Sequence, residues 1–225
     1  MQFIDVLHHN LEELYLLKHP FYQMWSNGSL DINILQNYAI EYYHHVAAFP
    51  RYISAIHSQS SNIKIRQILL DNLVDEEKGE DNHPELWQRF GDGIGVERSK
   101  YNYDKIKHKQ TKELVEGYFD LVKTDFATGL GALYAYERQT PEVSNSKIDG
   151  LKTHYGINDP KTLQFFSTHM AADEWHRQEF ADIISDLAPE QQQKVLAGAL
   201  AGAKLLWGFL DGLLEDVRMQ NNQCV

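Results

Sequence analysis

The sequence predicts an all-α protein built as a single compact bundle of about seven to eight helices. Apolar residues recur at steps of three and four along most of the chain, as in Ile65, Ile68 and Leu69. The alternating valine-rich runs that are typical of strands are absent. With 225 residues, of which 43% are hydrophobic and 24% charged, the chain has the size and balance of one soluble domain with a sizeable core.

Turn-forming residues divide this pattern into helices. Asp159 and Pro160 have the sequence of a helix start, with a capping carboxylate followed by proline in the first turn. We find no internal repeat and no long linker, so we expect one domain over residues 1–218 and a flexible polar tail over residues 219–225. The predicted breaks between helices lie at residues 26–28, 58–62, 91–95, 155–160 and 188–189.

Charge and cysteine content exclude several classes of function. Lys and Arg total 21 against 32 Asp and Glu, and the net charge of −11 argues against nucleic acid or an anionic membrane as a partner. The one cysteine, Cys224, can form no intramolecular disulfide. No basic leader precedes an apolar stretch, and no apolar run approaches the roughly 20 residues of a membrane span. We therefore expect a cytoplasmic protein.

The segment around His169 has the spacing of a metal-binding helix. His169, Asp173 and His176 follow one another at steps of four and three, which places the three side chains on one helix face. Phe165 and Phe166 lie on the same segment and favour an inward orientation. From the spacing alone, a surface stripe or a buried structural histidine fits as well as a set of ligands.

Two further segments offer ligands. Glu76 and His83 lie seven residues apart, although Gly79 and Pro84 predict that the helix bends or restarts between them. An acidic, solvated helix end is the alternative there. Glu137 is the only carboxylate in a run of small and apolar residues, and a carboxylate in such a helix requires a partner. The small residues of that run, from Gly129 to Ala135, allow close approach of another helix or a ligand.

Together these segments provide three carboxylates and three imidazoles. This mixture of oxygen and nitrogen donors suits non-haem iron or manganese, and six ligands suit two metal ions. Two divalent ions would leave the site with residual positive charge, which favours oxygen chemistry. Glu41 and His44 form a Glu-x-x-His pair of the kind found in ferritin-like bundles. Only one such copy exists, so we expect Glu41 and His44 to lie outside the ligand set.

The order of these residues is similar to the ligand pattern of the haem-oxygenase-like di-metal oxidases, and the similarity spans roughly residues 10 to 215. The resemblance implies a haem-oxygenase-like helical fold, shared with thiaminase-II and pyrroloquinoline-quinone synthase. It also implies two metal ions, iron and/or manganese, with dioxygen and an external reductant as co-substrates. The implied ligands are Glu76, His83, Glu137, His169, Asp173 and His176.

One branch of this family is implicated in making para-aminobenzoate for folate biosynthesis. Its members use one of their own tyrosines as the ring source and a lysine as the amino donor. The matching residues are Tyr22 and Lys147, and we expect Tyr43 and Tyr136 to act as relay tyrosines at the pocket. The resemblance thus implies an oxidoreductase that consumes its own side chains.

Several alternatives remain. Three other functions fit the sequence. They are a di-metal oxidase of a free small molecule, an oxidase resembling pyrroloquinoline-quinone synthase, and a protein-binding bundle with a structural metal site. Thiaminase chemistry needs a pocket cysteine, and Cys224 lies at the chain end. A haem site at His8, His9 or His19 would leave the carboxylates unexplained. The cysteine-rich tail of family members that bind death domains is missing after Asp211, which argues against such a partner, and a homodimer remains open.

Overall fold

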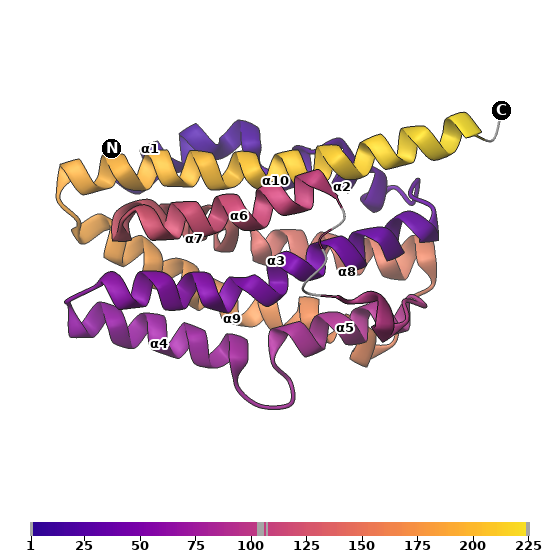
Figure 1. Ribbon diagram of the computed structural model, residues 1–225, viewed down its shortest axis with the longest axis horizontal. Helices are drawn as coiled ribbons and strands as arrows, with labels where there is room; N and C mark the ends of the chain where they lie inside the picture. Colours follow the sequence, from indigo (N-terminus) through magenta and orange to yellow (C-terminus); the bar gives the residue numbers. More distant parts are fainter. Residues whose placement is uncertain (1, 103–105, 107, 224–225) are drawn as a thin grey trace.

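The computed structural model describes residues 2–102, 106 and 108–223, and it describes side chains except those of 171–175 and 216–223. Over these residues the chain forms ten α-helices and three short 3-10 turns, with no strand (Figure 1). The all-α prediction is confirmed. The helices are α1 (Phe3–Leu11), α2 (Pro20–Ser26), α3 (Ile32–Gln59), α4 (Ile63–Glu77), α5 (His83–Gly93), α6 (Lys109–Thr124), α7 (Phe126–Glu137), α8 (Thr140–Tyr155), α9 (Pro160–Asp186) and α10 (Pro189–Gln223).

Helix ends lie where capping side chains and proline place them. The Asp159 carboxylate accepts the Thr162 N–H at 2.8 Å and Pro160 occupies the first turn of α9, as the sequence predicts. The number of helices exceeds the predicted seven or eight, and two of the boundaries that the sequence analysis did not predict are breaks of only one or two residues. Asp125 separates α6 from α7 by its extended backbone, and its carboxylate caps α7. Gln139 separates α7 from α8 in a similarly short break.

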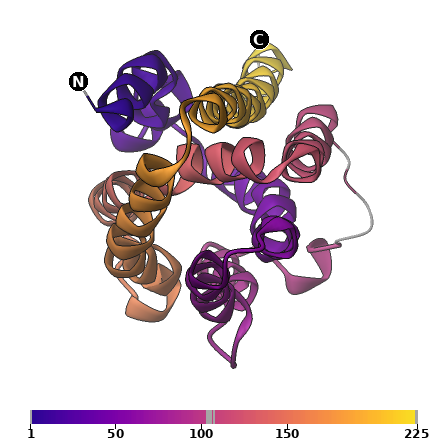
Figure 2. The same cartoon turned by 90° about the vertical axis from the view of Figure 1, so that its left-hand side faces the viewer.

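The helices pack in layers that place α7, α3 and α9 between two outer groups. Helix α10 lies along α7 and α6 on one side, and α4 and α5 lie on the opposite side against α3 and α9 (Figures 1 and 2). Two glycines set the closeness of α7 and α10. A Cβ on Gly131 would collide with the Val195 carbonyl, and one on Gly198 with the Thr128 carbonyl. The small residues of α7 therefore admit a neighbouring helix, one of the two options that the sequence left open.

One statement about membrane spans requires correction. Residues Pro189–Glu215 of α10 form a stretch of 27 residues that contains an 18-residue window with a mean hydropathy of 1.3, long and apolar enough by length and composition to cross a membrane. Half of that window is buried within the protein, as expected for a core helix that passes the same test. This stretch contains few charged residues because α10 packs against α7 and α6 over much of its length.

Candidate active site

Three of the predicted ligands form a compact buried group. Glu76 at the end of α4, His83 at the start of α5 and His169 in the middle of α9 have donor atoms within 4.8 Å of one another. The Glu76 and His83 side chains meet across the loop between α4 and α5, because α4 ends at Glu77 and the Asn82 amide oxygen caps the restarted helix. Glu76 and His83 therefore come together because the helix breaks between them, as Gly79 and Pro84 predict. They do not share the face of one continuous helix.

The two histidines of this group differ in their electrostatic state. His83 Nδ1 lies 2.7 Å from Glu76 Oε2. Burial lowers the pKa of His83, but the Glu76 carboxylate more than offsets this, so the net pKa is raised. Burial followed by the charge of His83 lowers the pKa of His169 well below its usual value. His169 Nδ1 donates to the Phe165 carbonyl oxygen at 2.6 Å, which leaves Nε2 as the available donor atom for a metal.

Glu137 is a buried carboxylate with one unused oxygen. It ends α7 and is 1% exposed. Its Oε1 accepts a hydrogen bond from the Asn72 side-chain amide at 3.0 Å, whereas Oε2 has no hydrogen-bond partner. Burial raises the pKa of Glu137 to about 8, and the charge of Glu76 contributes to this shift. A buried oxygen without a donor is what a carboxylate that binds a cation leaves in the metal-free protein.

The remaining predicted ligands are placed differently. His176 is buried on α9, and its Nε2 lies 3.3 Å from the Asp75 carboxylate at the end of α4, so it does not join the group of Glu76, His83 and His169. Asp173 lies on α9, but its side chain is outside the described residues. The structure thus brings together Glu76, His83 and His169 from the predicted set. His176 lies on the same helix as His169 but contacts Asp75 at the end of α4.

The donor group fits iron or manganese. Carboxylate oxygens and neutral imidazole nitrogens are the donors that these ions prefer. A cavity of about 10 Å³ adjoins Glu76, His83 and His169, which is room for roughly one water-sized particle. The unpartnered Glu137 oxygen adds a fourth candidate donor.

Glu41 and His44 lie on α3 outside this group. The Glu41 carboxylate accepts a hydrogen bond from the Thr111 hydroxyl at 2.6 Å, and it lies 3.7 Å from His108 Nε2. These contacts give the buried Glu41 carboxylate partners of its own. The ferritin-like alternative therefore gains no support from the described residues.

Tyr22 and Lys147 meet in a second buried cavity. Lys147 on α8 is 5% exposed, and its Nζ donates to the Tyr38 hydroxyl at 2.8 Å. The Tyr38 hydroxyl in turn lies 3.0 Å from the Tyr22 hydroxyl. Burial lowers the pKa of Lys147 to about 7 and raises that of Tyr22. Tyr38 is a site residue that the sequence reasoning missed.

A row of tyrosines connects this cavity to the metal donors. The rings of Tyr38 and Tyr42 stack with centroids 5.3 Å apart, and Tyr42 is hydrogen-bonded to Tyr136. Tyr136 and Phe165 line both small cavities, so they form the wall between them. Tyr43 lines neither cavity, and its ring lies 4.8 Å from that of Tyr101.

Comparison with known proteins identifies the relatives of this chain. Residues 36–207 match the family described as iron-containing redox enzymes. A 4-aminobenzoate synthase from Nitrosomonas europaea is 40% identical over 92% of this chain and 88% of its own length. A protein of the same name from Chlamydia muridarum is 37% identical, with coverages of 96% and 91%. These matches confirm the resemblance predicted from the ligand pattern.

More distant relatives share the fold. A pyrroloquinoline-quinone synthase from Acidiphilium cryptum is 26% identical over 87% of this chain and 81% of its own. The crystal structure of a TenA homolog from Pseudomonas syringae superimposes with a TM-score of 0.80 at 16% identity, covering 95% of this chain and 93% of that one. At this identity the likeness concerns the fold alone.

Proposed function

The chain belongs to the family of iron-containing redox enzymes, and we propose that it is an oxygen-dependent dinuclear metal oxidase that forms para-aminobenzoate from its own Tyr22 and Lys147. The observation that carries this proposal is the hydrogen-bonded set of Lys147, Tyr38 and Tyr22, buried next to the metal donors. The name of the relatives in Nitrosomonas europaea and Chlamydia muridarum supports the same product.

The metal centre of this proposal uses the six predicted ligands. Glu76, His83 and His169 already converge, and Glu137 has a free oxygen. His176 would exchange its Asp75 contact for a metal ion, and Asp173 lies one turn before it on α9. Bound iron or manganese would supply the redox chemistry by which dioxygen oxidises Tyr22. An external reductant would return the metal ions to their reduced state.

Lys147 is suited to the role of nitrogen donor by its burial. Transfer of its nitrogen requires the neutral amine, and a pKa of about 7 makes roughly half of the side chains neutral near physiological pH. The hydrogen bond to Tyr38 holds Nζ on the side of the cavity where the Tyr22 ring lies, 5.1 Å from its centre. The protein thus orients donor and ring without a bound small molecule.

The tyrosines between the two cavities provide a path for oxidation of Tyr22. Its phenolic proton can pass to the Tyr38 hydroxyl while Tyr38 passes its own proton to the neutral Lys147 amine, because these three groups are joined by hydrogen bonds. An electron can leave toward the metal centre through Tyr42, whose ring stacks on that of Tyr38, and then through Tyr136, which is hydrogen-bonded to Tyr42. Tyr136 was predicted as a relay residue, and in this proposal Tyr38 and Tyr42 share that role.

The small size of the cavity beside Tyr22 and Lys147 favours a substrate that is part of the chain over a free small molecule. The cavity beside Tyr22 and Lys147 has a volume of about 10 Å³, whereas pockets for small organic ligands occupy about 300 Å³ or more. An oxidase of a free aromatic molecule, or one resembling pyrroloquinoline-quinone synthase, would require this region to open. The Tyr22 ring already occupies the place that such a substrate would take.

Product release without added substrate tests the proposal. Metal-free protein is loaded anaerobically with iron or manganese, reduced, exposed to oxygen and assayed for para-aminobenzoate by mass spectrometry. We expect up to about one equivalent per chain, none from Tyr22→Phe or Lys147→Arg, and full metal content in both variants. Tyr43→Phe is the matched control, because Tyr43 lines neither cavity. Release from Tyr22→Phe, or many turnovers on an added substrate, would reject self-sacrifice.

A further inference from the structure

Asn72 is a buried polar residue outside the predicted ligand set. Helix α4 buries Leu69, Asn72 and Glu76, which follow one another at steps of three and four and so share the inner face of the helix. Asn72 is 1% exposed and lies one turn before the predicted ligand Glu76. Burial of an amide costs free energy unless its groups are hydrogen-bonded, so the partners of Asn72 indicate what the residue does.

The hydrogen bond from Asn72 gives the two Glu137 oxygens different roles. Asn72 Nδ2 donates to Glu137 Oε1 at 3.0 Å. Within the described part of the chain, Glu137 Oε2 has no hydrogen-bond partner, and neither has Asn72 Oδ1. Buried acceptors in this state lower the stability of the folded protein. Two of them on one hydrogen-bonded pair therefore indicate that a bound group completes the pair.

The same hydrogen bond connects Glu137 to the converged donors. Helix α4 packs chiefly against α3, whereas α7 packs chiefly against α10, so the contact orients the Glu137 carboxylate more than it joins the two helices. The next turn of α4 carries Glu76, whose donor atom groups with those of His83 and His169. Asn72 thus holds the Glu137 carboxylate one helical turn away from a member of the donor group.

We propose that Asn72 is a positioning residue of the metal site, which holds Glu137 Oε1 so that Glu137 binds a divalent metal ion through Oε2 alone. A carboxylate can bind a metal ion through one oxygen or through both. Hydrogen bonds to the ligands of a metal ion fix their orientation and the atom that they present. This inference rests on the proposed function only in requiring that Glu137 and the donor group bind metal.

A purely structural role is the alternative. In that role Asn72 would only satisfy a buried carboxylate oxygen, and its loss would lower the free energy of unfolding without any change in how metal is bound. The two roles therefore differ in metal affinity and in the coordination of Glu137, both of which can be measured without an assay of activity.

Metal binding by Asn72→Leu separates the two roles. Leucine has nearly the shape of asparagine but cannot donate to Glu137. Metal-free protein is titrated with cobalt(II) in competition with a chelator, and the infrared difference spectrum between cobalt-bound and metal-free protein is recorded. The antisymmetric and symmetric carboxylate bands lie further apart for a carboxylate bound through one oxygen than for one bound through both. Asn72→Ser, whose hydroxyl is too short to replace the amide, is measured in parallel, so that misfolding of one variant leaves the other.

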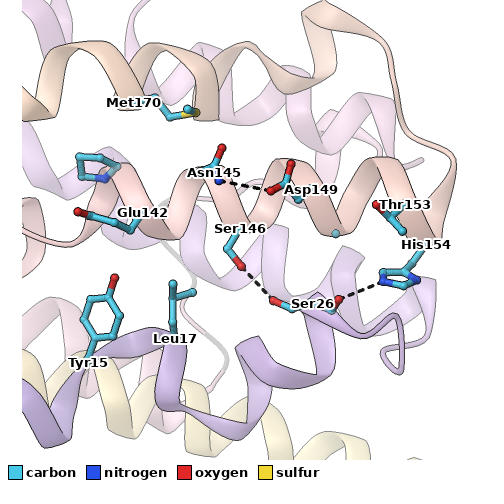
Figure 3. Close-up of a pocket in the computed structure, with 12 residues that line it drawn as sticks. Tyr15, Leu17, Ser26, Glu142, Asn145, Ser146, Asp149, Thr153, His154 and Met170 are labelled. Carbon is cyan, nitrogen blue, oxygen red and sulfur yellow. Dashed lines mark hydrogen bonds between the residues drawn. The ribbon is translucent and has the colours of Figure 1, made fainter.

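Asn145→Leu is the matched control. Asn145 Nδ2 also donates to a carboxylate from within a helix, to Asp149 Oδ2 at 3.3 Å (Figure 3). This pair lines a pocket of about 800 Å³ at the surface of α8, and none of the described metal donors lines that pocket. The control removes the same kind of hydrogen bond at a place that does not bind the metal ion.

We expect both Asn72 variants to bind cobalt about 10- to 100-fold more weakly than the unchanged protein. Their carboxylate bands should lie closer together, because Glu137 is then free to bind through both oxygens, and Asn145→Leu should keep the original affinity and spectrum. Unchanged affinity and spectrum in a folded Asn72 variant would overturn the positioning role, even if that variant is less stable. Weaker binding with unchanged band spacing would overturn binding through Oε2 alone. Failure of the unchanged protein to bind cobalt would instead reject the donor group of the proposed function, and this role with it.

Discussion

Replacement of Glu137 by glutamine should stabilise the metal-free protein while it removes metal binding. Glutamine has nearly the same shape as glutamate, and its carbonyl oxygen can keep the hydrogen bond from Asn72. The replaced carboxyl has a pKa of about 8 in the folded protein against 4.5 as its ordinary value. An acid whose pKa rises on folding takes up a proton on folding, so it favours the folded state at low pH and opposes it increasingly between these two values.

The size of this effect follows from the two pKa values. The cost to folding is about 1 kcal/mol at pH 5, about 3 kcal/mol at pH 7 and between about 4 and 5 kcal/mol at pH 8.5. Glu137→Gln removes this pH-dependent cost. The difference in free energy of unfolding between variant and original protein should therefore grow by about 2 to 3 kcal/mol from pH 5 to pH 7.

Urea unfolding in the presence of a chelator, followed by tryptophan fluorescence at several pH values, measures this difference. Glu142→Gln serves as the control, because Glu142 is exposed and the same replacement there removes no cost of burying a carboxylate. Metal analysis of the variant should show loss of bound ions. A difference that does not change between pH 5 and pH 7 would refute the burial of an unpaired carboxylate at this position.

Three further results are expected. In single-turnover assays, the rate of para-aminobenzoate release should rise as pH passes through about 7, because Lys147 must lose its proton, and a rate that is flat from pH 6 to 8 would contradict this. Glu41→Ala should leave metal content nearly unchanged, since Glu41 contacts Thr111 and His108 and not the donor group; loss of a metal equivalent would favour the ferritin-like alternative. Gly131→Ala should lower the free energy of unfolding by about 1 to 3 kcal/mol through collision with the Val195 carbonyl, as measured by urea unfolding.

Local sequence pattern was sufficient for most of the fold. Helical periodicity and the capping residue Asp159 are properties of neighbouring residues, so they could be recognised without tertiary information. The break at Asp125 was missed because no glycine or proline marks it. There an extended backbone and a capping carboxylate end one helix and start the next within a single residue.

Residue type and spacing offered Glu76, His83 and His169 as candidate ligands and left other interpretations open, and the family resemblance favoured the ligand interpretation. The structure brings their donor atoms within 4.8 Å of one another, through a loop that Gly79 and Pro84 only suggested. Tyr38 was missed because its role depends on contact with Lys147, 109 residues away. The available signal was its spacing of four from Tyr42, which places both on one face of α3. The contact of His176 with Asp75 depends on how α4 and α9 pack, which the local sequence does not specify.

Isotope content of the released product tests the central claim most directly. Protein is produced with tyrosine labelled in the ring with carbon-13 and lysine labelled in the side-chain amine with nitrogen-15, then loaded with metal, reduced and exposed to oxygen with no substrate added. The account predicts para-aminobenzoate that carries both labels, in an amount no greater than about one equivalent per chain, and loss of mass at Tyr22 and Lys147 in peptide maps. Unlabelled product, or labelled product with both residues intact, would contradict it.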